Sequence, residues 1–455
     1  MKKQWIVILL LLMGLSVMAQ NVTVSGRVNR PKALVRLMVV DDLLNRHETT
    51  IAETNSDEQG FFLLEGKISQ ILPASIAVGL ENVDLIVCPG AAYEVSITVP
   101  EVNPNASYFE RQSPTLRVKT ASDKGVYRQI IVSEQIINSY VLSYFDELYR
   151  RHQYRYIDSI RATIDQEMDI TSDYVRQHND YKIASVQMAV NADGGKKVIG
   201  EYFDRRPVLY SCQAYMDLFK DLFVNKFWQS PYTVKDFEDA FWGGPVDLKE
   251  YLDTDPFMAR NPDLAEMITI FNLRTMYYEQ PRFRKVIIDH LKAIYSRSKN
   301  PETKKMVSNM LERFGRFATG ADAPDFELVD VAGKPVRLSD YKNTTVVLQF
   351  VEGSSRTVDH QFEAMADLHH HWQDSVQFIT VTTKDQLPVW KKRFEEHGYD
   401  WPLLNLGNDI LLLERYEVRT LPEYFIIQPK TKIGMAPAPS PDQTMDVVVN
   451  GIIRK

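Results

Sequence analysis

The segment VVLQFVEGSSRTVDHQFEAM, residues 346–365, has residue types and a spacing that could carry chemistry. Its first half has the apolar pattern of a buried strand, and its second half begins a helix. A helix N-terminus that follows a buried strand presents main-chain N–H groups and the positive end of the helix dipole, which favour a thiolate or a bound anion. The turn between strand and helix holds Ser354, Ser355, Arg356, Thr357 and Val358.

A serine nucleophile is the first chemistry to consider, because His360 follows Ser355 by five residues. Five residues of α-helix correspond to about 500° of rotation, so the two side chains would not face each other. We therefore interpret Ser355 as a helix N-cap. Glu352 and Arg356 flank the turn, and together with the helix N-terminus they could bind a small anion or a polar peptide group.

Histidines close to this segment raise the question of a metal site. His369, His370 and His371 are adjacent on the predicted helix, so their side chains point in different directions, and a metal ion needs ligands on one face. His397 and Asp400 have no further ligand nearby in the sequence. We expect solvated histidines at a helix C-terminus, where cations suit the dipole, and we predict no metal and no cofactor. The sequence contains no nucleotide-binding loop or catalytic triad signature.

The elements that position the turn alternate between strand and helix patterns. Strands are predicted in DFELVD, KPVRLSDYK, TTVVLQFVE, VQFITVT, RTLPEYFIIQ and, last, MDVVVNGI. Helices are predicted in DHQFEAMADLHHHW, LPVWKKRFEEHG and DILLLERYEV. This alternation predicts an α/β domain over residues 317–455, with a central sheet and helices on both sides.

The rest of the chain divides into two further regions. Residues 20–105 alternate with period two and contain turns such as NSDEQG, which predicts a small antiparallel all-β sandwich. Residues 106–316 show apolar and aromatic stripes at helical spacing, which predict an all-α domain whose stripes form the core.

The first residues and the overall charge indicate where the protein works. Residues 1–19 combine Lys2 and Lys3, an apolar run and small residues before a cleavage point, which predicts a secretory signal peptide. The formal net charge is −7, and the absence of a basic run argues against nucleic acid as a partner. We expect an exported, periplasmic protein that is soluble after cleavage.

Residues 317–455 resemble the thioredoxin-like fold, in particular the bacterial envelope thiol–disulfide oxidoreductases related to TlpA and ResA. The resemblance rests on GADAPDFELVDVAGKPVRLSDYK, VVLQF, VQFITVTT, the helix with Trp390, YEVRTLPEYFII and APAPSP. It implies a cis bond at Leu421–Pro422, with the main chain of Leu421 beside the turn. Glu352, Leu421 and Pro422 would then border a peptide groove.

The same resemblance implies a Cys-x-x-Cys motif, and this motif is missing. Its two cysteine positions fall on Ser355 and Val358, and the position before the first, often tryptophan, falls on Ser354. Thiol–disulfide exchange needs a thiolate and a resolving thiol, and residues 317–455 contain no cysteine. The sequence therefore predicts a degenerate active site.

Three functions remain open from the sequence. The first is a non-catalytic module of the cell envelope that binds a protein or an extended peptide by main-chain pairing. The second is an enzyme of a thiol–disulfide pathway that uses Cys88 or Cys212, the two cysteines of the chain, although each is interpreted as a small buried apolar residue and a bridge between them is possible. The third is a structural component of an envelope assembly.

Overall fold

The computed structural model describes residues 19–101, 113–191, 193–229, 231–353, 355–372, 374–407, 409, 411–418 and 420–454. The predicted signal peptide, except Ala19, and Ser354 lie outside the described residues. No helix in the described ranges is long and apolar enough to cross a bilayer. The chain forms two compact units, one from the described parts of Met1–Val99 and Pro114–Leu311, the other from those of Pro100–Ser113 and Glu312–Lys455.

The first unit begins with a β-sandwich. One sheet has the order β4-β1-β7-β8 and the other has the order β3-β2-β5-β6. The strands are β1 (Gln20–Val28), β2 (Leu34–Asp42), β3 (His47–Asn55), β4 (Phe61–Ile68), β5 (Leu72–Val78), β6 (Glu81–Val87), β7 (Ala92–Thr98) and β8 (Thr115–Ala121). Inward-facing residues such as Val22, Val24 and Leu37 form one core between the sheets, as period-two alternation requires.

Two features of the sandwich differ from expectation. β1 pairs with β7 in parallel, with Val24 opposite Tyr93, so the predicted purely antiparallel arrangement is wrong. Parallel pairing joins segments that are distant in sequence, and local alternation does not encode it. The β region also extends past residue 105, because β8 pairs with β7.

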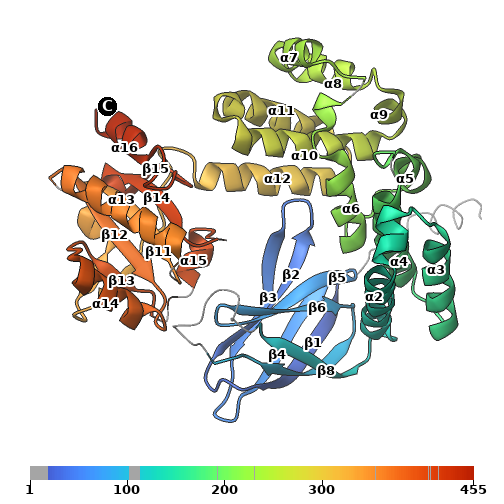
Figure 1. The fold of residues 1–455 in the computed structure, drawn as a ribbon, viewed down its shortest axis with the longest axis horizontal. Helices are drawn as coiled ribbons and strands as arrows, with labels where there is room; N and C mark the ends of the chain where they lie inside the picture. Colours follow the sequence, from blue (N-terminus) through green and yellow to red (C-terminus); the bar gives the residue numbers. More distant parts are fainter. Residues whose placement is uncertain are drawn as a thin grey trace, which may run out of the picture. The chain divides into compact units, whose positions relative to one another are not determined.

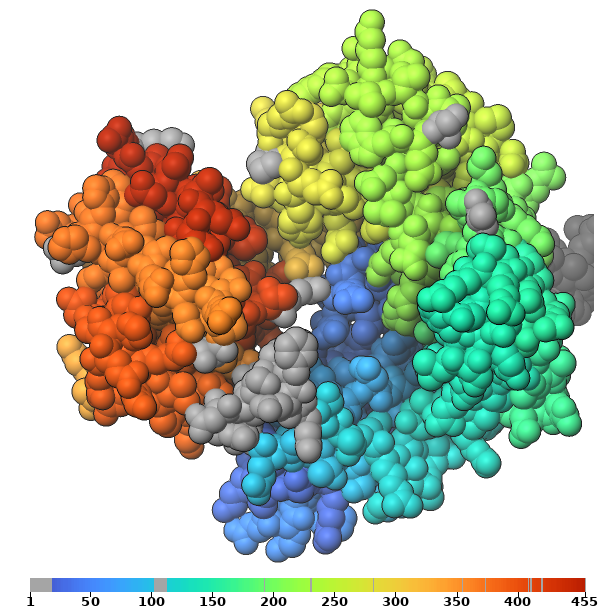
Figure 2. Space-filling model, in the orientation of Figure 1, coloured from blue at the N-terminus to red at the C-terminus, as the bar shows by residue number. Residues whose placement is uncertain are grey.

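Helices make up the remainder of the first unit (Figure 1). They are α2 (Val126–Ser143), α3 (Arg155–Glu167), α4 (Asp173–Val190), α5 (Lys196–Val198), α6 (Gln213–Phe223), α7 (Val234–Gly243), α8 (Pro245–Leu252), α9 (Pro256–Arg260), α10 (Pro262–Glu279), α11 (Arg284–Arg297) and the first part of α12 (Pro301–Arg316). Short π-helical turns lie at η2 (Asp146–Arg150) and η3 (Ile199–Phe203), and 3₁₀ turns at η4 (Lys226–Trp228) and η5 (Pro281–Phe283). Val126 and Val175 pack into the sandwich core, and in Figure 2 the teal helices form a continuous surface with the cyan strands.

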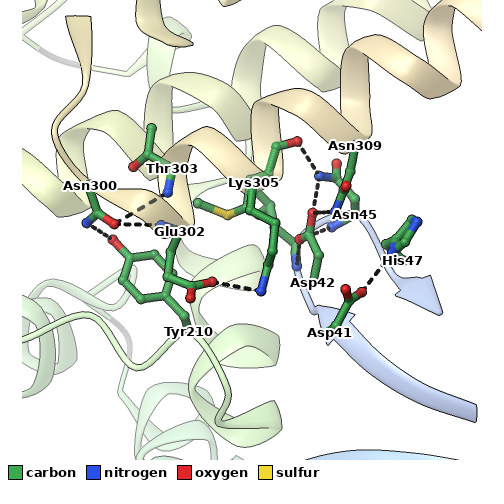
Figure 3. A network of polar contacts seen from close by, with 12 residues as sticks. Asp41, Asp42, Asn45, His47, Tyr210, Asn300, Glu302, Thr303, Lys305 and Asn309 are labelled. Carbon is green, nitrogen blue, oxygen red and sulfur yellow. Dashed lines mark hydrogen bonds and ion pairs between the residues drawn. The ribbon is translucent and has the colours of Figure 1, made fainter. Parts of the chain in front are cut away.

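A buried polar cluster joins the beginning of this unit to its end. The Asp42 carboxylate, 3% exposed, accepts hydrogen bonds from the main-chain N–H groups of Leu44 and Asn45 over 3.1 Å each. It also accepts from Asn45 Nδ2 at 2.7 Å and from Asn309 Nδ2 of α12 at 3.0 Å (Figure 3). Asn45 Nδ2 donates in addition to the carbonyl of Met306 at 2.9 Å. These bonds fix the β2–β3 turn against α12.

The second unit is built on one seven-stranded sheet of order β10-β9-β13-β12-β11-β14-β15. The strands are β9 (Glu327–Asp330), β10 (Pro335–Arg337), β11 (Thr345–Val351), β12 (Val376–Thr382), β13 (Leu403–Asn405), β14 (Glu423–Gln428) and β15 (Lys432–Met435). The other elements are α13 (Arg356–Trp372), α14 (Leu387–His397), α15 (Leu411–Arg415), α16 (Met445–Ile453), η6 (Leu338–Tyr341) and η7 (Pro429–Thr431). Figure 1 shows these elements from orange to red.

Helices cover both faces of this sheet, which confirms the α/β prediction. One core contains side chains of α13, α14 and α16, including Phe362, Trp390 and Val449. The other contains Leu412 of α15, Leu338 and Tyr416. MDVVVNGI was expected to be a strand and is instead helix α16, because Met445 and Val449, four residues apart, bury one helical face while Val447 is exposed.

Candidate functional site

Strand pairing brings the two predicted parts of the site to the same edge of the sheet. β11 is buried along its whole length, as expected for a central strand covered on both faces. Phe350, near its end, pairs with Glu423 at the start of antiparallel β14. The turn that follows β11 and the Leu421–Pro422 segment that precedes β14 therefore lie at neighbouring strand ends.

The Leu421–Pro422 peptide bond is cis, which confirms that expectation. Leu421 and Pro422 are partly exposed, and the Leu421 side chain packs against the core that contains Phe425 and Tyr416. The ladder between β14 and β11 begins at Glu423. The main chain of Leu421 thus lies outside that ladder.

The described residues of the turn are organised by two hydrogen bonds. Trp390 Nε1 of α14 donates to the main-chain carbonyl of Glu352 over 2.6 Å. Ser355 Oγ accepts from the main-chain N–H of Val358 over 3.3 Å, which is the N-cap interaction expected for this position. Arg356 and Thr357 are exposed, whereas Val358 is buried in the core beneath α13. Ser354 lies outside the described residues.

A Ser355–His360 pair is not formed. Ser355 Oγ is used for the cap, and the His360 ring is exposed, with Nδ1 3.8 Å from Glu363 Oε2. In the first turns of α13 the strong ionic contact is instead between Asp359 and Arg393 of α14. This contact ties α13 to α14.

A buried chain of polar side chains lies below α13, and the sequence analysis missed it. Gln349 Nε2 donates to Tyr424 OH at 3.2 Å, and Tyr424 OH donates to Gln361 Oε1 of α13 at 3.0 Å. On the other side, Thr380 Oγ1 donates to Gln349 Oε1 at 2.9 Å and accepts from Trp401 Nε1 at 3.0 Å. Burial raises the pKa of Tyr424, so its phenol stays protonated. The available signal was Gln349 itself, a polar residue in an otherwise apolar strand.

The histidines do not form a metal site in the described part of the chain. No group of three or more His, Cys, Asp or Glu side chains within those residues could hold a metal ion. His369 Nδ1 lies 3.3 Å from Asp400 Oδ1 and its ring packs on Trp401. The tilted ring contact with Trp401 and the Asp400 carboxylate account for the position of His369.

Cys88 and Cys212 are both free and buried, so they do not bridge each other. Burial is the largest cause that raises the pKa of each thiol to about 11. Cys212 precedes α6, where main-chain N–H groups of Ala214 and Tyr215 lower its pKa without offsetting burial. At neutral pH both groups are therefore thiols rather than thiolates, which are the reactive form.

Comparisons with known proteins agree with the geometry of the second unit. Residues 319–436 match the AhpC/TSA family. Over 118 residues the chain is 30% identical to the thiol-disulfide oxidoreductase ResA of Bacillus subtilis, which covers 26% of this chain and 65% of that protein. Against ResA of Geobacillus thermodenitrificans it is 28% identical over 117 residues, or 26% of this chain and 67% of the relative. The match thus spans just under two thirds of the first of these relatives.

Two solved structures illustrate the similarity of this region to known proteins. A putative thiol-disulfide oxidoreductase from Bacteroides vulgatus is 21% identical, covers 30% of this chain and 98% of its own, and has a TM-score of 0.28. A putative thiol:disulfide interchange protein DsbE from Chlorobium tepidum is 18% identical, covers 30% and 99% of the two chains, and has a TM-score of 0.27. The family match and the ResA relatives confirm the resemblance seen in the sequence.

Proposed function

We propose that the C-terminal region, which matches the AhpC/TSA family over residues 319–436 and is similar to the thiol-disulfide oxidoreductase ResA, is a non-catalytic module that binds an extended peptide or a protein partner. The observation that carries the proposal is the absence of cysteine from residues 317–455. Disulfide exchange forms and breaks S–S bonds through a thiolate and a mixed disulfide, and this domain supplies neither thiol.

The two residues at the motif positions have other roles. Ser355 Oγ caps α13 by accepting the Val358 N–H, and the Val358 side chain is 6% exposed and packs into the core. A hydroxyl used as a cap and a buried isopropyl group stabilise the helix start. Neither can form a disulfide.

The binding part of the proposal is supported by what the domain keeps. The turn after β11 and the cis Leu421–Pro422 segment lie at neighbouring strand ends, and the main chain of Leu421 is outside the β14 ladder. An extended peptide can pair with such main-chain groups as an added strand would. Exposed Arg356 and Thr357 border the same turn and would set which peptides fit.

The pattern of residues 1–19 supports export to the cell envelope, and we place the proposed module in the periplasm. The alternative that Cys88 or Cys212 serves a thiol–disulfide pathway is weakened by their burial and by their raised pKa values of about 11. A purely structural role in an envelope assembly would leave the edge beside Leu421 without a ligand.

The test uses the purified mature chain in two measurements. A disulfide-reductase assay is expected to show no turnover. Calorimetric titration with unfolded polypeptide whose thiols are permanently alkylated is expected to show binding. Thr357→Trp should block this binding, whereas Asp367→Trp, at an exposed position later on the same helix, should not. Turnover that disappears in Cys88→Ala or Cys212→Ala would refute the proposal, and so would binding that ignores Thr357→Trp.

A further inference from the structure

A cavity of about 290 Å³ lies among helices α8 to α11 of the first unit. Each helix turns one face toward it, with Leu248 and Leu252 on α8 and His290, Ile294 and Arg297 on α11. These spacings of three and four residues are those of a single helical face. The facing side of α9 and α10 carries small residues, including Ala259 and Ala265, so the longer side chains opposite them leave a space unfilled.

The inner part of the cavity is aliphatic. Leu248, Leu252, Met258 and Ile294 line it, and each is at most 8% exposed. Among them sits His290, whose Nε2 donates to the Phe241 carbonyl at 2.9 Å. Burial lowers the pKa of His290, so the ring is neutral and brings no charge into the cavity. Such a lining favours a ligand with an aliphatic body.

Four charged residues line the outer part, and two of them neutralise each other. Lys249 pairs with Asp253 along α8. Glu266 Oε2 accepts from Ser298 Oγ at 2.7 Å, and Arg297 Nη2 donates to the Pro245 carbonyl at 3.1 Å. Within the described ranges neither Glu266 nor Arg297 forms an ion pair. Glu266 on α10 and Arg297 on α11 therefore line the same cavity with opposite charges.

We propose that this cavity binds a free α-amino acid with an aliphatic side chain of about the size of leucine. Arg297 would hold the carboxylate and Glu266 the ammonium group, with the side chain among Leu248, Met258 and Ile294. Charge balance decides between ligand classes. A ligand with only a carboxylate would be repelled by Glu266, and a ligand with only an amine would be repelled by Arg297. A zwitterion offsets both charges. The volume, at the low end for ligand pockets, suits so small a molecule.

The first test is calorimetric titration of the whole mature chain with four compounds. L-Leucine is expected to bind. Glycine lacks the aliphatic side chain, 4-methylpentanoate lacks the ammonium group and isopentylamine lacks the carboxylate, so each should bind at least about tenfold more weakly. Equal affinity for leucine and glycine, or no binding of leucine, would overturn the proposal.

The second test uses variants with a matched control. Arg297→Gln should weaken leucine binding by about tenfold or more, while Lys292→Gln, on the same helix and outside the lining, should leave it unchanged. Ala265→Leu should fill the cavity and abolish binding. If Ala265→Leu does not fold, the comparison of the two Gln variants still decides, because leucine affinity that is unaltered by Arg297→Gln contradicts the proposed site.

Discussion

The indole of Trp390 on α14 donates its hydrogen bond to the main-chain carbonyl of Glu352, 2.6 Å away, at the first residue after β11. Trp390 is 1% exposed and stacks on Phe362 of α13. The Trp390 side chain therefore joins the end of β11 and the turn to helices α13 and α14. The conformation of the turn depends on packing and a main-chain carbonyl rather than on sulfur chemistry.

Trp390→Phe is expected to loosen the turn. It removes the donor to Glu352 and part of the buried indole, which should cost about 2–4 kcal/mol of unfolding free energy. Amide hydrogen exchange should accelerate at Gly353 and Ser355 while Ile379 in β12 stays protected. Phe394→Leu, a packing loss on the same helix that spares the Glu352 hydrogen bond, is the control. Equal acceleration in both variants would contradict the role given to the indole.

Replacing Ser355 and Val358 together by cysteine should restore a dithiol. The two positions are three residues apart in the first turn of α13, where the helix N-terminus lowers the pKa of the first thiol. We expect Ser355→Cys/Val358→Cys to form an intramolecular disulfide, detected by mass spectrometry after alkylation, and to gain reductase turnover. Ser355→Cys alone should do neither. A double variant that keeps two free thiols under oxidising conditions would show that the turn is not built for this chemistry.

Native Cys88 and Cys212 should resist thiol reagents at pH 8. Their pKa values of about 11, against the ordinary 9.0, keep them protonated, and burial blocks access. Because the unfolded chain loses these protons first, the two thiols should lower stability as pH rises from about 9 to 11. In urea, both thiols should react with the reagent once the protein unfolds. Rapid labelling of either thiol in the folded protein would contradict the expectation.

Lys220 should give the first unit the opposite pH dependence. Its Nζ donates to the Leu43 carbonyl at 2.7 Å, and burial is the main cause that lowers its pKa to about 8 from 10.5. In that window the unfolded chain binds more protons, so stability should rise with pH between about 8 and 10.5. The rise should be on the order of 1–3 kcal/mol, since Lys220 is partly exposed. Lys220→Met should remove this rise in stability. The measurement is the urea midpoint of the native protein and of the variant, compared across this pH range.

Asp42→Asn should destabilise the first unit far more than Asp41→Asn. The Asp42 carboxylate accepts four hydrogen bonds, and an amide group would turn one acceptor into a donor that faces other donors. We expect a loss of about 2–4 kcal/mol. Asp41 pairs with His47 while both are substantially exposed, so Asp41→Asn should cost at most about 1 kcal/mol. Urea denaturation followed by circular dichroism measures both, and similar midpoints would contradict the central role of Asp42.

The sequence was sufficient to predict the α/β domain, the central strand β11 and the capping role of Ser355. These features follow from local patterns: apolar runs, helical stripes and a hydroxyl at a helix start. Helix α16 was missed because a short run of β-branched valines fits both periods, and only the burial of Met445 and Val449 decides. The parallel β1–β7 pair, the Gln349–Tyr424 chain and the cavity at Ala265 depend on contacts between distant segments. No local pattern specifies such contacts.

The bond between Asp42 and Asn309 joins residues 267 positions apart, and the bond from Asn45 to Met306 spans 261. Contacts of such separation close late, because the intervening chain must first be ordered. In a chain synthesised from its N-terminus, the strands of the sandwich emerge while the Asp42 carboxylate still lacks Asn309. The β2–β3 turn is completed only when α12 arrives. Until then, the earliest strands of the first unit are held by the core between the two sheets.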